Sequence, residues 1–378
     1  MNSPAHALPV RTEVAIVGAG PTGLALAVTL ALAGIDFVLL DQQDEGANTS
    51  RAAVVHARTL EVLDELGASS ELIGRGVKLT RFAVRDGARR LLTVPFDRLP
   101  TPHPYTLMVP QYETEAVLLG RLRALGGDVH RPHQVSSVVQ DQDGVTLTTS
   151  TGQTLRASYA VGADGMHSTV REASGIGFTG SSYAESFVLA DVVMDWAPGP
   201  DEVSLTFGVA GLLVVAPLPG GHYRVVATTD QAPEHPDLAL VQQLLDQRTP
   251  GQAVVTDVAW SSRFRVHHRV ADHYRAQRLF LAGDAAHVHS PAGGQGMNTG
   301  IQDGHALGTA FATDTLDGYE AHRRPVAQRV VAFTDRMTRI ATTRNVAART
   351  LRNTAMRLLG HTPLPTKLAT ELAELNYR

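Results

Sequence analysis

The sequence predicts an α/β fold: a nucleotide-binding domain built on parallel strands, an antiparallel β-sheet inserted into it, and a helical C-terminal tail. Three observations predict it. Residues 13–41 have the pattern strand, glycine turn, helix, strand, which is the order of a dinucleotide-binding unit. From residue 187 to residue 257, strand-forming runs alternate with Pro and Gly turns, as in an antiparallel sheet. Residues 335–359 carry apolar residues at helical spacing.

The first pattern predicts a phosphate-binding turn. Apolar residues 14–17 run into Gly18-Ala-Gly20-Pro21-Thr22-Gly23, and a helix-forming stretch follows as far as Gly34. In such a unit the first glycine makes the tight turn, the second lets the backbone approach a pyrophosphate, and the third lets the helix pack closely on the strand. The helix N-terminus would direct unpaired N–H groups at the phosphates.

A carboxylate completes this unit. The second apolar run, residues 37–40, ends at Asp41, about 20 residues beyond the glycines, where an acid accepts hydrogen bonds from the adenosine ribose. A glycine triplet alone is a weak signal, and its alternative is an ordinary turn. Strand, helix and terminal acid together indicate a Rossmann-like dinucleotide site.

Composition narrows the classes of function. The chain has 378 residues, 43% of them hydrophobic and 19% charged, which is enough for two domains with a full core. A net charge of −4 gives no field that favours nucleic acid. The absence of cysteine excludes disulfides, iron–sulfur clusters, cysteine-bearing zinc sites and thiol nucleophiles. No secretory signal or apolar span is recognisable, so we expect a cytoplasmic protein without an integral membrane span.

The remaining elements predict the domain boundaries. Short strands among prolines in residues 80–110 indicate a different layer, and a hairpin is predicted at residues 135–140 and 145–149. Two further strands end at Asp164-Gly165 and Gly283-Asp284. We therefore expect a nucleotide-binding domain in three parts (10–79, 111–180 and 265–334), an inserted substrate domain in two (80–110 and 181–264), and a tail (335–378).

Three separated segments, in this order, resemble the FAD-dependent aromatic hydroxylases, the class A flavoprotein monooxygenases typified by para-hydroxybenzoate hydroxylase. They are Gly18-Ala-Gly-Pro-Thr-Gly23, the stretch from Gly162 to Arg171, and the stretch from Leu281 to Asn298. The segments around Arg51 and Gln111 look like two further signatures of that family.

The resemblance implies a Rossmann-like FAD domain and a reaction. Such enzymes take electrons from NADH or NADPH, add O2 at the flavin C4a carbon, and use the hydroperoxide to hydroxylate an aromatic or polyketide-like small molecule. It also implies a monomer or homodimer that binds no nucleic acid. Oxidation of a non-aromatic substrate, such as epoxidation, stays open, and so does non-catalytic FAD binding. A flavin halogenase is disfavoured, because Trp196 and Trp260 are isolated although Lys78 is suggestively placed.

The resemblance also assigns site residues by position. Pro291 would lie beside substrate and flavin, with a carbonyl free to orient a hydroxyl, and Arg51 would contact the flavin. No base is assigned; Tyr183, His222 and Tyr223 are candidates. The cofactor-binding positions implied are Gly18, Gly20, Pro21, Thr22, Gly23, Asp41, Arg51, Gln111, Val135, Asp164, Gly283, Asp284, Gly294, Gly296, Met297 and Asn298, with Arg171 as the structural partner of Asp164.

Two other features have competing interpretations. His287-x-His289 and His267-His268 suggest a metal, but no third ligand accompanies them at metal spacing, so we predict no metal site. The arginine-rich helix of the tail is expected to cover the back of the FAD domain. The alternative is a basic amphipathic helix that lies on a membrane.

Overall fold

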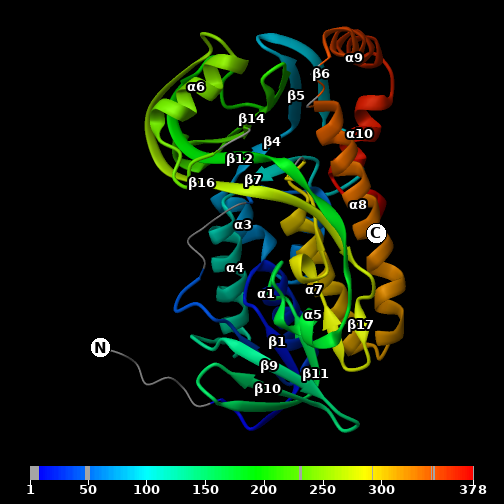
Figure 1. Ribbon diagram of the computed structural model, residues 1–378. Coiled ribbons are helices and arrows are strands. Elements are labelled where there is room, and N and C mark those ends of the chain that lie inside the picture. Colours follow the sequence, from blue (N-terminus) through cyan, green and yellow to red (C-terminus); the bar gives the residue numbers. More distant parts are fainter. Residues whose placement is uncertain are drawn as a thin grey trace.

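A computed structural model describes residues 8–46, 52–229, 232–291, 293–341, 343 and 345–377, with the backbone alone at 182–185 and 265–266. In this part of the chain two eight-stranded sheets lie at opposite ends of an elongated molecule, and a three-stranded sheet lies between them (Figure 1). Two long strands and one long helix run between the ends (Figure 1).

The first sheet has a parallel centre, in the order β18-β11-β1-β2-β8. The central strand β1 is apolar on both faces because both faces are covered; Val14, Ala15 and Ile16 are fully buried. The antiparallel strands β17, β9 and β10 extend it. Its strands are β1 (Arg11–Val17), β2 (Phe37–Leu40), β8 (Val129–His130), β9 (Val135–Gln140), β10 (Val145–Thr149), β11 (Thr154–Gly162), β17 (Arg275–Ala276) and β18 (Leu279–Leu281).

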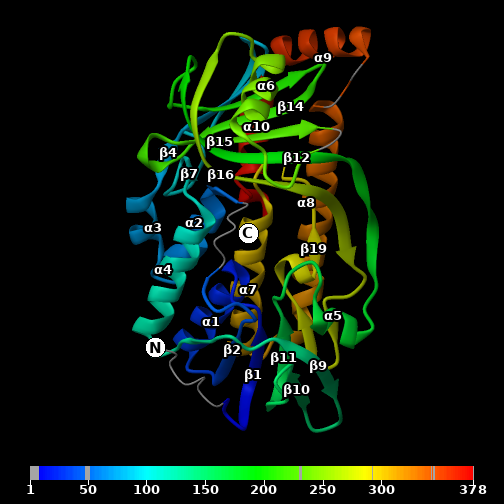
Figure 2. The same cartoon turned by 60° about the vertical axis from the view of Figure 1, so that its left-hand side comes forward.

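Helices α1 (Pro21–Ala33) and α7 (Gly296–Ala312) pack unusually closely beside this sheet (Figure 2). Three glycines of α7, at positions 300, 304 and 308, face α1, and a Cβ at any of them would collide with Thr22 or Thr29. Helix α1 begins with Pro21 and ends at Gly34, which adopts φ 71°. The close contact brings the N-terminus of α7 next to the first glycine turn.

The second sheet has the order β19-β16-β12-β15-β14-β13-β5-β6 and is antiparallel except for the β5–β13 pair. One face packs on α6 (Leu238–Arg248) through residues such as Val188 and Val225. The opposite face, with Phe187 and Leu212, packs against Ala53 and against Met108 of β7 (Thr106–Met108). Its strands are β5 (Arg81–Asp86), β6 (Arg89–Pro95), β12 (Phe178–Trp196), β13 (Val203–Gly208), β14 (Gly211–Pro217), β15 (Tyr223–Thr229), β16 (Ala253–Ala271) and β19 (His287–Val288).

These strands bear on the predicted domain boundaries. Strands β12 and β16 each run unbroken past the expected borders at residues 181 and 264. The division into domains therefore stays a prediction.

The three-stranded sheet comprises β3 (Val54–Val55), β7 (Thr106–Met108) and β4 (Val77–Leu79). The other helices before the tail are α2 (Ala57–Glu65), α3 (Ser69–Arg75), α4 (Gln111–Ala124) and α5 (Thr169–Ser174).

The tail is helical, as expected, but part of it packs on a different sheet from the one expected. Helix α8 (Tyr319–Ala341) runs along the molecule, whereas α9 (Val346–Leu359) and α10 (Leu364–Leu372) contact β6 of the second sheet (Figure 1). The expectation that this helix covers the FAD domain is wrong for α9. Apolar spacing identifies which face of a helix is buried, but not which neighbour buries it.

Candidate active site

The parallel strands of the first sheet end at one edge, and the three motif segments meet there. Successive strand ends are joined by backbone hydrogen bonds: Gly18 N–H to the Leu40 carbonyl (2.8 Å), Ala163 N–H to the Val17 carbonyl (2.8 Å) and Ala282 N–H to the Gly162 carbonyl (3.0 Å). In open α/β sheets, ligands bind outside the carboxyl ends of the strands. We call this edge the cofactor edge.

The three glycines of the first motif have different surroundings. Gly18 has φ 102°, and a Cβ there would collide with the Ala163 carbonyl. A Cβ at Gly23 would collide with the Gly18 carbonyl. Gly20, by contrast, has φ −74° and its Cβ would meet no protein atom within 4 Å. Open space therefore lies over Gly20, at the N-terminus of α1, next to Pro21 and Thr22.

Asp41 lies at the end of β2, as predicted, and its carboxylate already contacts the first motif. Its Oδ2 accepts from the Ala19 N–H (2.7 Å) and its Oδ1 from the Gln43 N–H (2.8 Å). Arg131 Nη2 lies 4.0 Å from Oδ2. Within the described residues, the buried Nε and Nη1 of Arg131 have no hydrogen-bond partner. Buried N–H groups without an acceptor are costly, so these two nitrogens are suited to an acceptor supplied by a ligand.

Gln111 is the first residue of α4, and Val135 is the first residue of β9. Gln111 Nε2 donates to Glu115 Oε1 (2.8 Å), and its backbone N–H donates to the Ala52 carbonyl (3.1 Å). Burial raises the pKa of Glu115. Val135 is buried at the start of β9, just beyond a loop whose His133 N–H donates to the Asp41 carbonyl (2.6 Å). Arg51 lies outside the described residues.

Asp164 has a structural role in its own segment. Its Oδ2 accepts from the N–H groups of Thr169 (2.7 Å) and Val170 (3.3 Å), at the start of α5. Burial raises its pKa. Arg171 joins the second and third motifs, because it donates to the Met166 carbonyl (2.7 Å) and to the Ala285 carbonyl (2.9 Å).

Asp284 is exposed, although Gly283 and Ala285 on either side of it are buried. Beneath this turn, Asp303 Oδ2 accepts from the Gly283 N–H (3.2 Å) and pairs with His287 Nε2 (2.7 Å). Asp303 also accepts from Arg323 Nε (2.6 Å). Burial alone would raise the pKa of Asp303, but the cationic Arg323 holds that pKa below its usual value. The Nε2 atom of His287 is therefore already paired with a carboxylate of the protein.

The third motif presents backbone rather than side chains. Asn298 Oδ1 accepts from the His56 N–H (2.8 Å), while Nδ2 donates to the carbonyls of Val54 (2.9 Å) and Gly294 (2.7 Å). Its amide is therefore used within the protein. The N–H groups of Gly296, Met297 and Asn298 form the first turn of α7 and have no intrahelical acceptor. Gly294 has φ 66°, and a Cβ there would come within 2.9 Å of Val54.

The Pro291 carbonyl accepts from the Gly294 N–H (2.9 Å) and closes the turn that leads into α7. Because a carbonyl oxygen has two lone pairs, the role of Pro291 in orienting a hydroxyl stays a prediction. His56 Nε2 lies 2.7 Å from the Gly293 carbonyl in the same turn, and burial lowers the pKa of His56 to about 4. Hydrogen bonding inside the turn therefore shapes the loop itself.

The end of the chain supports this loop, which no motif indicated. Gln295 Nε2 donates to the Leu372 carbonyl (2.9 Å). Buried Glu374 accepts from Thr299 Oγ1 (3.2 Å) and from Gln302 Nε2, both on α7. Burial raises the pKa of Glu374 to about 8. Nothing in the local sequence distinguishes this glutamate, because its partners lie about 75 residues earlier in the chain.

The second sheet has an apolar surface that packs on the same cluster as Ala53 and Val54, at the start of the three-stranded sheet. Phe187 stacks on Phe264 with ring centroids 5.3 Å apart, and Val214 and Val226 are partly buried beside them. Of the candidate bases, Tyr223 packs on the opposite face, against α6, so it is excluded. His222 lies in the turn before β15, and the side chain of Tyr183 lies outside the described residues.

A buried ion pair connects this sheet to the cofactor edge. Arg224 on β15 donates through Nε and Nη2 to Asp191 on β12, both at 2.7 Å. Its Nη1 donates to the Ala52 carbonyl (2.9 Å), which also accepts from the Gln111 N–H. The second sheet thereby contacts the chain immediately after Arg51.

The described residues fit FAD. In strand order, the cofactor edge offers the unpaired nitrogens of Arg131 after β8, the open space over Gly20 after β1, the exposed Asp284 after β18, and the N–H groups of the α7 first turn. They offer a phosphate cradle, polar groups for ribose and ribityl, and donors for a flavin ring. Among the described residues, no group of three His, Cys, Asp or Glu is arranged for a metal.

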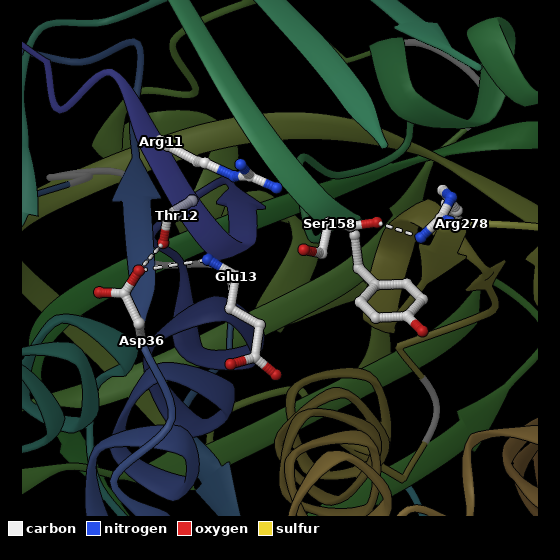
Figure 3. Close-up of a pocket in the computed structure, with 7 residues that line it drawn as sticks. Arg11, Thr12, Glu13, Asp36, Ser158 and Arg278 are labelled. Atoms are coloured by element: carbon white, nitrogen blue, oxygen red, sulfur yellow. Dashed lines mark hydrogen bonds between the residues drawn. The ribbon is translucent and has the colours of Figure 1, made fainter. Parts of the chain in front are cut away.

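A separate cavity lies at the opposite edge of the first sheet. It has a volume of about 640 Å³ and is lined by Arg11, Glu13, Asp36, Tyr159 and Arg278, among others (Figure 3). Asp36 accepts from Thr12 Oγ1 (2.8 Å) and from the Glu13 N–H (3.2 Å), as Figure 3 shows. This hollow is at the amino ends of the strands, away from the three motifs.

Comparisons with known proteins agree with this geometry. A family model described as FAD binding domain matches residues 11–334. Rifampicin monooxygenase of Streptomyces venezuelae is 37% identical over 336 residues, which cover 84% of this chain and 69% of that protein. The 12-dehydrotetracycline 5-monooxygenase/anhydrotetracycline 6-monooxygenase of Streptomyces rimosus is 36% identical over 351 residues, or 86% of this chain and 69% of that one.

The solved structures agree as well. The crystal structure of p-nitrophenol 4-monooxygenase from Pseudomonas putida superposes with a TM-score of 0.87 at 28% identity, covering 98% of both chains. None of the helices in the described part of the chain combines the length and hydropathy needed to cross a membrane. The chain therefore belongs to the FAD binding domain family, among its flavin-dependent aromatic monooxygenases.

Proposed function

We propose that this enzyme, an FAD-dependent monooxygenase, hydroxylates the ring of an aromatic or polyketide-like molecule that lies between the cofactor edge and the apolar face of the second sheet. One observation carries the proposal: Val214, Val226 and Phe264 are only partly buried and pack on the same apolar cluster as Val54, which borders Gly294 of the third motif. Overall, NAD(P)H, a proton, O2 and the aromatic C–H compound become NAD(P)+, water and the hydroxylated product.

Bound FAD would supply the chemistry, by accepting hydride and activating O2. The chain would hold it in order along the edge. Gly20 and the α1 N-terminus would contact the pyrophosphate, Asp41 and Arg131 the adenosine half, and Asp284 the ribityl chain. Negative charge on the reduced ring would be stabilised by the N–H groups of Gly296 to Asn298 and by the α7 dipole.

The substrate side of the site would orient the ring and exclude water. Aromatic and aliphatic side chains of β14, β15 and β16 offer an apolar wall, which favours a planar, weakly polar compound. The relatives named above are monooxygenases of rifampicin, of 12-dehydrotetracycline and anhydrotetracycline, and of p-nitrophenol. We infer a substrate of the same chemical class for this chain.

The test combines a cofactor variant with isotope labelling. Purified protein is given NADH or NADPH, ¹⁸O2 and a panel of phenols and polyketides, and products are examined by mass spectrometry for one added ¹⁸O. Asp284→Ala should weaken FAD binding and lower hydroxylation, whereas Asp246→Ala, an exposed acid on α6, should change neither. If Asp284→Ala kept full FAD occupancy and normal coupled turnover, the third motif would have been assigned wrongly. If no compound of the panel gained ¹⁸O or accelerated NAD(P)H oxidation, the proposed substrate class would be contradicted.

A further inference from the structure

The exposed apolar surface of this protein is concentrated on one short stretch. Fourteen large hydrophobic residues are exposed in the described part of the chain, and six of them fall within residues 340–364. The most exposed of these lie on α9: Leu351 (72%), Leu358 (69%) and Val346 (67%). Singly exposed apolar residues are ordinary, but a cluster of this kind indicates an interaction surface.

Helix α9 has two distinct sides. Its inner side is anchored to the second sheet: Arg352 donates to the Phe207 carbonyl (3.1 Å), and Asn353 Nδ2 donates to Asp86 Oδ2 (2.6 Å). Leu351 and Leu358 are seven residues apart, two helical turns, so they lie on one side of the helix. Their exposure shows that this side points away from the protein. Figures 1 and 2 both show α9 as an outermost element at the end that carries the second sheet.

Along the chain, the charged residues in and around α9 are all basic, although Asp86 of β5 lies against its inner side, 3.9 Å from Arg349. From residue 336 to residue 370 the sequence contains six arginines, one lysine and no aspartate or glutamate. The whole chain, in contrast, has a net charge of −4. The basic charge is therefore local, and it accompanies the exposed leucines.

We propose that the outer side of α9 docks on the surface of an anionic phospholipid bilayer. Apolar side chains on a basic amphipathic helix enter the boundary between headgroups and acyl chains, while the cations meet lipid phosphates. At 14 residues α9 is too short to cross a bilayer, so it would lie in the plane of the surface. Apolar ring compounds partition into such a surface, and the enzyme would meet them there.

Charge argues against the other occupants of this face. A second copy placed across a two-fold axis would bring two acid-free, arginine-rich segments against each other. A nucleic acid would match the arginines but not the leucine stripe between them, because phosphates gain nothing from Leu351 and Leu358. An anionic bilayer is complementary to both features.

The test is vesicle flotation with the FAD-loaded full chain. Vesicles of phosphatidylcholine with one-quarter phosphatidylglycerol should carry the protein upward, vesicles of pure phosphatidylcholine should carry much less, and 0.5 M NaCl should release most of it. The double variant Leu351→Ser/Leu358→Ser should lose at least fivefold of the bound fraction. The matched control Val139→Ser/Val254→Ser removes two exposed valines elsewhere and should bind like the wild type.

Two outcomes would overturn the proposal. One is flotation that is absent, or that is equal in wild type and in the leucine variant. The other is a wild type that ignores vesicles but dimerises in size-exclusion chromatography, or binds an oligonucleotide, through the same leucines. Hydroxylation by the leucine variant is measured separately in detergent-free buffer and should be unchanged, so a failure here is distinct from a failure of the proposed reaction.

Discussion

At the scale of single residues, Glu374 is a buried acid whose ionisation opposes folding. Burial raises its pKa from 4.5 to about 8, so between these values the folded chain holds a proton that the unfolded chain has lost. Stability must then fall as pH rises through this window. From pH 6 to pH 9 the loss is about 2–3 kcal/mol in free energy of unfolding, at 1.36 kcal/mol per pH unit.

Glu374→Gln should remove this pH dependence, because glutamine resembles the protonated acid and can still bond Thr299 and Gln302. Urea unfolding of wild type and variant at pH 6 and pH 9 measures the difference. We expect the variant to be more stable than the wild type already at pH 6, because the unfolded acid is ionised there, and we expect this advantage to grow by about 2–3 kcal/mol at pH 9. A wild type and variant that weaken equally between the two pH values would contradict this assignment.

Substitutions at two glycines of the first motif should distinguish an effect on FAD binding from an effect on folding. Gly20→Ala adds a methyl group where no protein atom lies within 4 Å, so the protein should fold normally. That methyl would occupy the proposed pyrophosphate space and should weaken FAD affinity about tenfold, or about 1.4 kcal/mol. Gly23→Ala instead collides with the Gly18 carbonyl and should destabilise the protein. FAD titration and thermal unfolding of both variants test this contrast, which would fail if Gly20→Ala bound FAD normally.

At the scale of elements, the glycine face of α7 sets the position of its N-terminus. A Cβ at Gly304 would collide with the Thr22 carbonyl and crowd the Leu26 N–H. Gly304→Ala should therefore push α7 from α1, cost about 1–3 kcal/mol of stability, and lower FAD retention. Gly120→Ala, within α4, meets no atom within 4 Å and should stabilise the protein by about 0.5–1 kcal/mol. Chemical unfolding and flavin content are the measurements, and equal behaviour of the two variants would contradict the close-packing argument.

The sequence could predict those elements whose hydrophobic pattern and turn residues lie within a few positions of one another. The second strand, residues 37–40, and the hairpin at residues 135–149 have the predicted bounds, because alternation and turn residues are encoded within a few positions. The first helix begins three residues earlier than the first apolar residue, at Pro21, since proline suits a first helical turn. The position of α9 could not be predicted, because its neighbour β6 lies about 250 residues away.

The predicted site residues also differ from the missed ones in whether the local sequence contains a motif. Gly18, Asp41 and Gly283 belong to strand ends that carry a motif. Arg131 carries none, but it follows β8, which is parallel to β2, and so it reaches the edge where Asp41 lies. A residue after each predicted parallel strand would have been a candidate by topology alone. Glu374 and Arg224 act through contacts between distant segments, which only the folded chain reveals.

At the scale of the whole molecule, the two sheets must keep a fixed distance for a bound ring to meet the cofactor. Arg224 contributes to this, because it joins Asp191 of the second sheet to the Ala52 carbonyl at the cofactor edge. Both side chains are largely buried. Replacing one partner of such a pair leaves an uncompensated charge and costs about 3–5 kcal/mol, whereas replacing both by apolar residues of similar size is often nearly neutral.

Arg224→Met should accordingly destabilise the chain by about 3–5 kcal/mol, and adding Asp191→Leu should restore most of that stability. The double variant still lacks the donor to Ala52, so its substrate sheet and cofactor edge should be less well aligned. Because a misplacement near 1 Å can cost about a hundredfold in rate, we expect the fraction of NAD(P)H oxidation that ends as hydrogen peroxide to rise several-fold in the double variant. Urea unfolding and parallel assays of peroxide and hydroxylated product measure the two effects separately. A double variant that regains stability and also regains full coupling would show that Arg224 serves folding alone, and that the alignment of the two sheets depends on other contacts.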